Sequence, residues 1–367
     1  MIEKELLIVG AGPAGLTLAS ALLPSVPATV ISEHSRPQSF HSRATGIQPR
    51  TLDILSSVGI IDAVRREALT LLGNRVYVDG IERLAVSFYD PQTRQHGLSL
   101  DQRRIEKLLE DRSAELGRDV AWGTSLVDLH EGNGRVMAEV QRDDGSTELW
   151  GCRFVVGCDG GRSAVRKAAG IPFSGTTYTE RNFVLDALVH GDLEPGFMHY
   201  FVGKETRLVL VPLNDRGLFK VSGAFAPNAE GDELALLAAL AREHGRGTID
   251  IEPLTPCTTY VMHARIADAF QRNGRIFLCG DAAHLFPPNG GQGMNVALED
   301  AFELARAFNR LAEGAESSEL ARYEGRRGEV AKRLQAVIDS KDLYSYERLQ
   351  APLDPSQEQR RIEREEL

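Results

Sequence analysis

Apolar residues recur along this chain in two patterns that alternate from the N-terminus onward. Short apolar runs, which are typical of buried strands, lie at residues 6–9, 28–31, 154–158 and 276–279. Other segments repeat an apolar residue every three or four positions, and this spacing predicts helices at 16–23, 49–58, 61–67, 100–116, 294–313 and 317–345. Buried strands interleaved with helices are typical of an α/β fold built on a parallel sheet.

A second group of predicted strands follows without helices between them. These strands lie at 183–190, 197–203, 206–212 and 217–225, with a helix at 231–244 and a last strand at 258–262. Earlier in the chain the pattern predicts a hairpin, 74–79 and 82–88, and a small meander at 119–122, 125–130, 135–141 and 147–150. We therefore expect an antiparallel sheet inserted between two halves of the α/β domain. The predicted divisions are an α/β domain at 1–175 and 263–315, a sheet domain at 176–262, and a C-terminal helix and tail at 316–367.

A glycine-rich turn joins the first strand to the first helix. Residues 10–15 read Gly-Ala-Gly-Pro-Ala-Gly, and the second strand ends just before Glu33. In such a βαβ unit Gly10 permits a tight turn, Gly12 lets a diphosphate approach the backbone, and Gly15 lets helix and strand pack closely. Glu33 is placed to bind ribose hydroxyls. The turn thus predicts a Rossmann-like dinucleotide site, but it does not separate FAD from NAD.

Two later strands each deliver an acid to a glycine-containing turn. Asp159-Gly160 follows the strand at 154–158, and Gly280-Asp281 follows the strand at 276–279. The second turn continues into Pro-Pro-Asn-Gly-Gly-Gln-Gly at 287–293 and then into a helix that begins near Met294. A helix N-terminus favours an anionic ligand. The alternative is an ordinary strand–loop–helix corner, and Arg43 is likewise open between a phosphate ligand and a surface residue.

Composition narrows the class of protein. The chain has 367 residues, enough for about two domains, with 42 basic and 52 acidic residues and a net charge of -10. This charge argues against general nucleic-acid binding. The four cysteines form no C-x-x-C pair, so we expect free thiols, no metal site and a reducing compartment. The N-terminus resembles no signal peptide and no apolar run is long enough for a membrane span, so we expect a cytoplasmic protein.

The three glycine and acid motifs, in this order, resemble those of the single-component FAD-dependent aromatic hydroxylases, the group of para-hydroxybenzoate hydroxylase and phenol hydroxylase. The resemblance covers about residues 4–340 and includes the stretch that begins at Ser42-Arg43. It implies a Rossmann-like FAD-binding domain with an inserted antiparallel-sheet substrate domain and C-terminal helices. The thioredoxin-like C-terminal domain of the larger members has no counterpart here, so no capping by that domain is expected.

The resemblance also implies which residues contact FAD. The ADP half would be held by Gly10, Gly12, Pro13, Ala14, Gly15, Glu33, His34, Arg43 and Gln102, with Leu126 near the adenine. Asp159, Gly160 and Arg166 would serve both FAD and NAD(P)H, and Asp281 would accept a hydrogen bond from the ribityl chain. The isoalloxazine ring would be flanked by Pro288, Gly291, Gly293, Met294 and Asn295.

The implied reaction is an NAD(P)H- and O₂-consuming monooxygenation, in which a flavin C4a-hydroperoxide hydroxylates a phenolic or polyketide-like aromatic substrate. Baeyer–Villiger oxygenation or epoxidation on the same fold is an alternative, and a non-redox flavin-binding carrier of an unstable intermediate is another. The choice between NADPH and NADH, and between monomer and homodimer, stays open. No catalytic side chain is identified, and His284 is expected to hold its loop rather than to transfer a proton. Candidates for the substrate pocket, for each of which a packing or surface role is favoured, are His199, Tyr200, Arg207, Phe225, Tyr260 and Pro288.

Overall fold

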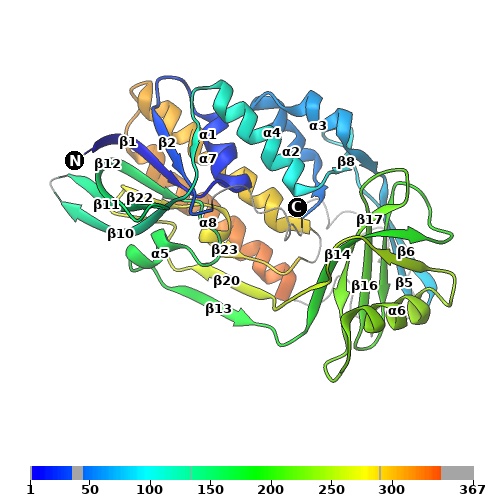
Figure 1. Cartoon of the computed structure of the whole chain (residues 1–367). Coiled ribbons are helices and arrows are strands. Elements are labelled where there is room, and N and C mark those ends of the chain that lie inside the picture. Colours follow the sequence, from blue (N-terminus) through cyan, green and yellow to red (C-terminus); the bar gives the residue numbers. More distant parts are fainter. Residues whose placement is uncertain (1, 35–43, 133, 289–290, 340–367) are drawn as a thin grey trace.

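The computed structural model describes residues 2–34, 44–132, 134–288 and 291–339. These residues form two lobes (Figure 1). The larger lobe contains a mostly parallel sheet with helices against it, and the smaller lobe contains a second sheet with a helix of its own. The predicted α/β fold is therefore confirmed.

The first sheet is centred on two long parallel strands, β1 (Ile2–Val9) and β12 (Thr147–Gly157). Beyond β1 lie β2 (Ala28–Ile31) and β9 (Val120–Ala121), and beyond β12 lie β10 (Thr124–Gly132), β11 (Arg135–Arg142), β21 (Gln271–Arg272) and β22 (Ile276–Leu278). Residues 147–152 of β12 pair antiparallel with β11, whereas residues 155–157 pair parallel with β22. One edge of β12 thus serves two neighbours in succession.

This pairing corrects two predictions. The strands predicted at 147–150 and 154–158 are one continuous strand, because Gly151 and Cys152 are both fully within the ladder. The strand predicted at 119–122 lies outside the meander and pairs parallel with β2. The meander is therefore the continuation of the parallel sheet rather than a separate unit.

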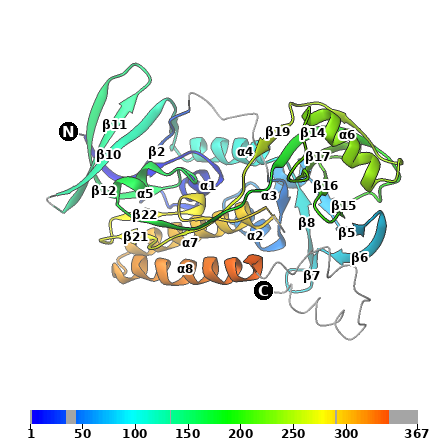
Figure 2. The same ribbon diagram turned by 90° about the horizontal axis from the view of Figure 1, so that it is seen from below.

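Helices flank this sheet, and several of them begin shortly after one of its strands ends. They are α1 (Pro13–Ala21), α2 (Pro49–Ser57), α3 (Ile61–Glu67), α4 (Gln102–Glu115), α5 (Ala164–Ala168), α7 (Gln292–Ala312) and α8 (Ser318–Asp339). Helix α1 begins three residues before its predicted start, since Pro13 is suited to the first turn of a helix. Helices α7 and α8 lie side by side in both Figure 1 and Figure 2. None of the described helices is both long and apolar enough to cross a membrane.

The second sheet has seven strands along one path, β18-β14-β17-β16-β15-β5-β6, and β19 pairs with β14. Their bounds are β5 (Gly73–Val78), β6 (Ile81–Ser87), β14 (Asn182–His190), β15 (Phe197–Val202), β16 (Arg207–Pro212), β17 (Leu218–Ala224), β18 (Asp250–Pro253) and β19 (Thr258–Tyr260). The predicted hairpin β5–β6 joins this sheet, and β5 runs parallel to β15, so the sheet is not wholly antiparallel. The domain divisions stay a prediction, and this pairing places residues 73–87 with the second sheet.

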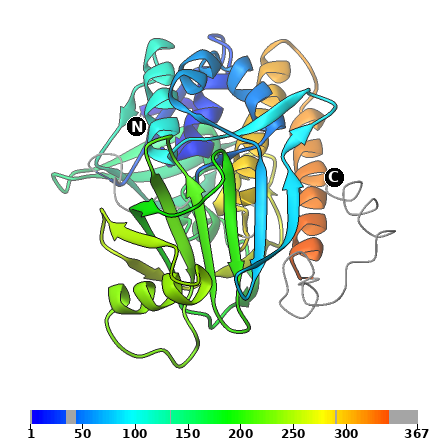
Figure 3. The ribbon, with the colours of Figure 1, turned by 90° about the vertical axis from the view of Figure 1, so that its right-hand side faces the viewer.

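The two faces of the second sheet differ in what packs against them. One face packs against α6 (Glu233–His244), as Figure 3 shows, and its Phe183 and Leu210 lie in one apolar cluster with Leu237 of the helix. The opposite face, called the inner face below, carries an apolar cluster of its own. Its members are Val76, Val78, Tyr200, Val202, Val209 and Val211.

Two small sheets complete the fold, and most of their strands are too short to predict from alternation. The first consists of β13 (Phe173–Thr177), β20 (His263–Ala267) and β23 (His284–Leu285). The second consists of β3 (Gly46–Ile47), β4 (Leu69–Leu71), β7 (Tyr89–Asp90) and β8 (Gln95–Ser99).

Candidate functional site

The turn after β1 shows why three glycines occur there. Gly10 has φ +107, and a Cβ on it would lie 2.3 Å from the carbonyl oxygen of Cys158. A Cβ on Gly15 would lie 1.9 Å from the carbonyl oxygen of Gly10. A Cβ on Gly12 would meet nothing within 4 Å, and no side chain caps the N-terminus of α1. Gly10 and Gly15 thus permit close packing, whereas Gly12 leaves open space beside helix N–H groups, which suits a diphosphate.

The turn after β12 is tied to the turn after β22 by Arg166. Its Nη1 donates to the carbonyl oxygen of Ala282 and its Nη2 to that of Gly161, both at 2.8 Å. The guanidinium also lies over the ring of Phe173, 3.8 Å from the centroid, and the residue is only 5% exposed. Burial lowers the pKa of Arg166 from its ordinary value. Arg166 therefore positions two backbone turns, and its contact with FAD or NAD(P)H stays a prediction.

Asp159 sits at the same turn, beside Gly160, whose φ is +74. Its Oδ2 accepts a hydrogen bond from the Val165 N–H at 3.1 Å, at the start of α5. Its Oδ1 is buried without a hydrogen-bond partner among the described residues. Burial raises the pKa of this carboxyl above its ordinary value. A buried oxygen without a partner fits a site at which a further donor binds.

The turn after β22 is held by a buried network centred on Asp300. Its Oδ2 lies 2.5 Å from His284 Nε2 and accepts from the Gly280 N–H at 3.2 Å, while its Oδ1 accepts from Arg327 Nε at 2.5 Å. Asp300 is 0% exposed and His284 1%. The expectation that His284 holds its loop is confirmed. Asp281, in contrast, is exposed on the same turn.

The N-terminus of α7 lies against this turn. A Cβ on Gly280 would approach Ala297 of α7 at 3.0 Å and Ala14 of α1 at 3.2 Å, so both helices meet at Gly280. Gly291 precedes α7 in the left-handed conformation (φ +65), and no side chain caps this helix. A Cβ on Gly291 or on Gly293 would meet nothing within 4 Å. Two uncapped helix N-termini therefore converge next to open space.

Asn295 fastens α7 to the segment before α2. Its Oδ1 accepts from the Gln48 N–H (2.9 Å) and from Thr51 Oγ1 (2.7 Å), and its Nδ2 donates to the carbonyl oxygens of Gly46 (3.0 Å) and Gly291 (2.8 Å). The side chain is 1% exposed and its amide is fully used. The side chain of Asn295 therefore positions the helix, and a contact of this residue with the flavin ring stays a prediction. Met294 is 8% exposed in the adjoining apolar cluster, and Pro288 is exposed.

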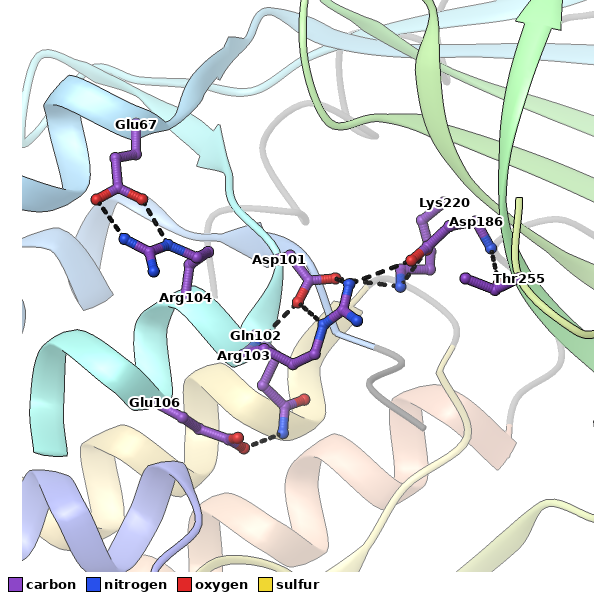
Figure 4. Close-up of polar contacts among 9 residues, drawn as sticks. All are labelled: Glu67, Asp101, Gln102, Arg103, Arg104, Glu106, Asp186, Lys220 and Thr255. Atoms are coloured by element: carbon purple, nitrogen blue, oxygen red, sulfur yellow. Dashed lines mark hydrogen bonds and ion pairs between the residues drawn. The ribbon is translucent and has the colours of Figure 1, made fainter. Parts of the chain in front are cut away.

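The other predicted FAD ligands lie on neighbouring elements. Glu33 follows β2 with an exposed carboxylate, 3.7 Å from His34 Nε2. Gln102 is the first residue of α4, and its Nε2 donates to Glu106 Oε1 at 2.7 Å (Figure 4). Leu126 is 8% exposed in β10, within the core of the first sheet. Arg43 lies outside the described residues.

The predicted substrate candidates divide between the two faces of the second sheet. His199 lies on the α6 side, 3.2 Å from Tyr77 Oη and 3.2 Å from the carbonyl oxygen of Glu194. Phe225 stacks on Phe183 with centroids 4.4 Å apart on that side. Both side chains therefore pack within the sheet on the α6 side, and whether either contacts a substrate stays a prediction.

Two other candidates lie on the inner face. Tyr200 pairs with Val209 in the row that also contains Val76. Arg207 donates to Asn182 Oδ1 at 3.1 Å. Tyr260 pairs with Asn182 at the edge of the sheet. Their contact with a substrate stays a prediction.

Sequence reasoning missed a buried ion cluster between the lobes, formed by Asp101, Arg103, Asp186 and Lys220 (Figure 4). Lys220 Nζ lies 2.5 Å from Asp186 Oδ1 and 3.2 Å from Asp101 Oδ2. Arg103 Nη2 lies 3.2 Å from Asp186 Oδ2. The sequence did contain a signal for this cluster. Asp186 and Lys220 are each a single charged residue within an apolar strand, and such charges are rarely buried without a partner.

Comparison with known proteins places this geometry in a family. The model of the FAD-binding domain family matches residues 3–337. A 6-methylpretetramide 4-monooxygenase of Streptomyces rimosus is 33% identical over 328 residues, which is 86% of this chain. The chain belongs to the FAD-dependent aromatic hydroxylase family. The resemblance inferred from the sequence motifs is confirmed, and FAD is the cofactor of this flavoprotein.

Solved structures agree with this assignment. The flavin-dependent monooxygenase PieE, in complex with FAD and substrate, has a TM-score of 0.81 at 25% identity over 91% of this chain. The Diels-Alderase PyrE3 has a TM-score of 0.71 at 26% identity over 91% of this chain and 73% of its own. The flavoprotein chain spans 57% of the S. rimosus enzyme and 62% of PieE. The residues present fit FAD, because Gly12, Gly291 and Gly293 leave open space beside the two uncapped helices.

Asp281 offers a test of this site that spares the fold. The Asp281→Ala variant of the flavoprotein is expected to bind FAD about 10-fold to 100-fold more weakly, since a charge-assisted hydrogen bond contributes about 1.5–3 kcal/mol. Its melting temperature without FAD should stay near that of the wild type, because the Asp281 side chain is exposed. Fluorescence titration of the apoprotein measures the first quantity. The Asp215→Ala variant, which removes an exposed acid of the β16–β17 turn, is the control, and equal FAD affinity in both variants would remove Asp281 from the site.

Proposed function

We propose that this protein is an FAD-dependent monooxygenase that uses NADPH or NADH, together with O₂, to hydroxylate a phenolic or polyketide-like aromatic compound. The observation that carries the proposal is the convergence of the uncapped N-termini of α1 and α7 at Gly280. The names of the S. rimosus enzyme and of PieE support it.

FAD supplies the redox chemistry when bound, by accepting a hydride from the nicotinamide and activating O₂ for transfer of one oxygen atom. The residues of the chain bind and orient the reactants. The N-terminus of α7 carries partial positive charge, which stabilises negative charge that develops on a group held there. The Asp300 network keeps the adjoining turn in place, so Asp281 meets its ligand without rearrangement.

The inner face of the second sheet supplies the surface for the substrate. Its row Val76–Tyr200–Val209 is apolar and comes from three adjacent strands. An apolar surface of valines and one aromatic ring suits an aromatic substrate and excludes water. Tyr200 and Arg207 are the candidates for orienting polar groups of that substrate, and no side chain is assigned as a catalytic acid or base.

A second candidate is a non-redox function in which bound FAD has no turnover and the protein holds a reactive intermediate. The likeness to the Diels-Alderase PyrE3 favours this alternative, because the same fold there is named for carbon–carbon bond formation. Baeyer–Villiger oxygenation or epoxidation also remains compatible with the fold, since fold does not fix reaction. The oligomeric state, monomer or homodimer, and a cytoplasmic location stay predictions.

One experiment separates these functions. FAD-loaded protein is mixed anaerobically with NADPH or NADH, with and without a panel of phenols and polycyclic aromatic polyketides, and the flavin absorbance is followed. We expect one class of aromatic compound to accelerate bleaching, and ¹⁸O₂ then to leave one labelled oxygen as a hydroxyl group on the product. A labelled ester or epoxide would replace hydroxylation with the corresponding oxygenation. Protein that neither nicotinamide reduces, with any compound of the panel, would contradict the monooxygenase proposal and favour the non-redox function.

A further inference from the structure

The buried ion cluster connects the two lobes through the start of α4. Lys220 and Asp186 are directly opposite each other on β17 and β14, on the inner face beside Val211. Asp101 is the N-cap of α4 and accepts from the Arg103 N–H at 3.0 Å. The cluster thus joins two strands of the second sheet to the first turn of a helix in the first lobe.

The cluster balances its own charge, and three of its four side chains are mostly buried, whereas that of Arg103 is 35% exposed. Two carboxylates, Asp101 and Asp186, face two cations, Arg103 and Lys220. The Lys220 side chain is 5% exposed, and the carboxylates are 12% and 11% exposed. Burial would raise the pKa of Asp101, but the hydrogen bond from Arg103 and the charge of Lys220 outweigh it and hold that pKa below its ordinary value. The ion pairs of the four side chains therefore hold one another in place.

The strand side of the cluster is rigid. The Asp186 N–H donates to Thr255 Oγ1 at 2.8 Å, and the Asp186 carbonyl oxygen accepts from the Leu254 N–H at 2.8 Å. The cluster therefore ties the α4 end to a strand that is itself held on its other side.

The helix side of the cluster leads to the cofactor site. Ile105 of α4 packs in one apolar cluster with Leu16 of α1 and Met294 of α7. Ser20 of α1 also donates to the carbonyl oxygen of Leu109 at 3.3 Å. Gln102, a predicted FAD ligand, lies between the two cluster members Asp101 and Arg103. A shift of the start of α4 would therefore displace the helices and the amide that form the FAD site.

We propose that Lys220 is a positioning residue for FAD, which holds the first turn of α4 against the inner face of the second sheet through Asp186 and Asp101. The FAD site is complete only when the second sheet is docked on α4. This inference rests on FAD binding alone, so it stands or falls independently of the hydroxylation reaction.

The test compares FAD affinity with the stability of the apoprotein in full-length variants. Lys220→Met is expected to raise the FAD dissociation constant about tenfold or more, the size seen when a residue that orients a ligand-binding group is removed. Lys220→Arg keeps the charge and should stay within about threefold of the wild type. The matched control is Arg104→Met, which removes a two-point ion pair with Glu67 one residue further along α4, directed away from the second sheet. This control should leave the dissociation constant within about twofold.

A double variant tests whether Lys220 affects FAD binding by positioning α4 or only by balancing the charge of the cluster. Lys220→Met combined with Asp186→Asn leaves the Asp101–Arg103 pair balanced, so the melting temperature of the apoprotein should recover relative to Lys220→Met. FAD affinity should stay weak, because the contact of Lys220 with Asp101 is still absent and only Arg103 joins the helix to the sheet. Recovery of both quantities would overturn the proposal, as would a Lys220→Met variant with the FAD affinity of the wild type. If Lys220→Met does not accumulate as folded protein, the double variant alone decides.

Discussion

An Asp300→Ala variant is expected to lose about 3–5 kcal/mol of unfolding free energy, the cost typical of removing one partner from a buried ion pair. Asp300 is 0% exposed and is the shared acceptor for His284, Arg327 and the Gly280 N–H. Its removal leaves the Arg327 guanidinium, 5% exposed, without its buried carboxylate. Urea unfolding followed by circular dichroism measures the loss.

The control for this variant is Glu299→Ala. Glu299 is next to Asp300 and also pairs with Arg327, at 3.1 Å, but its side chain is 25% exposed. An ion pair of this kind contributes about 1 kcal/mol or less. If the two variants lost the same stability, the buried network would not be what holds the turn after β22.

The Asp300 network also predicts how stability depends on pH. Burial would raise the pKa of Asp300, but the charges and hydrogen bonds of His284 and Arg327 outweigh it, so the pKa in the folded protein is below its ordinary value. A depressed carboxyl pKa contributes stability that is fully present above the unfolded-state pKa of about 3.9 and is lost as the pH falls through the folded-state value. Wild-type unfolding free energy should therefore fall more steeply below about pH 4 than that of Asp300→Asn.

A Gly12→Ala variant is expected to fold normally and to bind FAD at least about 100-fold more weakly. The backbone of Gly12 (φ -82, ψ -174) is allowed for alanine, and the added Cβ meets no atom within 4 Å. The apoprotein should change in stability by less than about 1 kcal/mol, the usual range for this position of a helix. The Cβ instead occupies the space through which a diphosphate approaches the backbone. Apoprotein melting and FAD titration measure the two effects.

The neighbouring Gly15 gives the opposite result and so serves as the comparison. In Gly15→Ala the Cβ would lie 1.9 Å from the carbonyl oxygen of Gly10, and backbone cannot give way cheaply. The apoprotein should lose about 3 kcal/mol or more, as overpacked sites do. A Gly12→Ala variant that bound FAD like the wild type would place the diphosphate elsewhere.

The strand–turn–helix units that carry the predicted cofactor residues were largely predictable, because their signals are local. Strand, glycine turn and helix follow one another within a few residues at both Gly10–Gly15 and the Gly280–Asn295 stretch, and the structure places both where expected. The apparent break at Gly151-Cys152 misled the strand assignment, since glycine usually weakens a strand, yet here long pairing on both sides outweighs that preference.

The orientation of strand side chains and the pairing of buried charges were not predictable, because both depend on contacts between segments that are distant in the sequence. Alternation showed that residues 197–203 form a strand, but both faces of β15 are apolar, so the pattern did not reveal that His199 points toward α6 and Tyr200 toward the inner face. Asp300 and Arg327, and likewise Lys220 and Asp101, find each other only in the fold. In the sequence, each of these residues is a charged residue at a position where the pattern expects an apolar one. Such a position predicts that the charge is buried, but it does not predict which residue pairs with it.

The shared edge of β12 also governs the order in which this protein can be completed during translation. Val155 to Gly157 pair with β22, which the ribosome adds about 120 residues later, after the whole second sheet. At ordinary elongation rates this interval is roughly 6 to 24 seconds. Throughout it the nascent chain exposes an apolar strand edge of the kind that pairs with other chains. We therefore expect a polypeptide truncated before residue 276 to aggregate rather than to form a smaller flavoprotein.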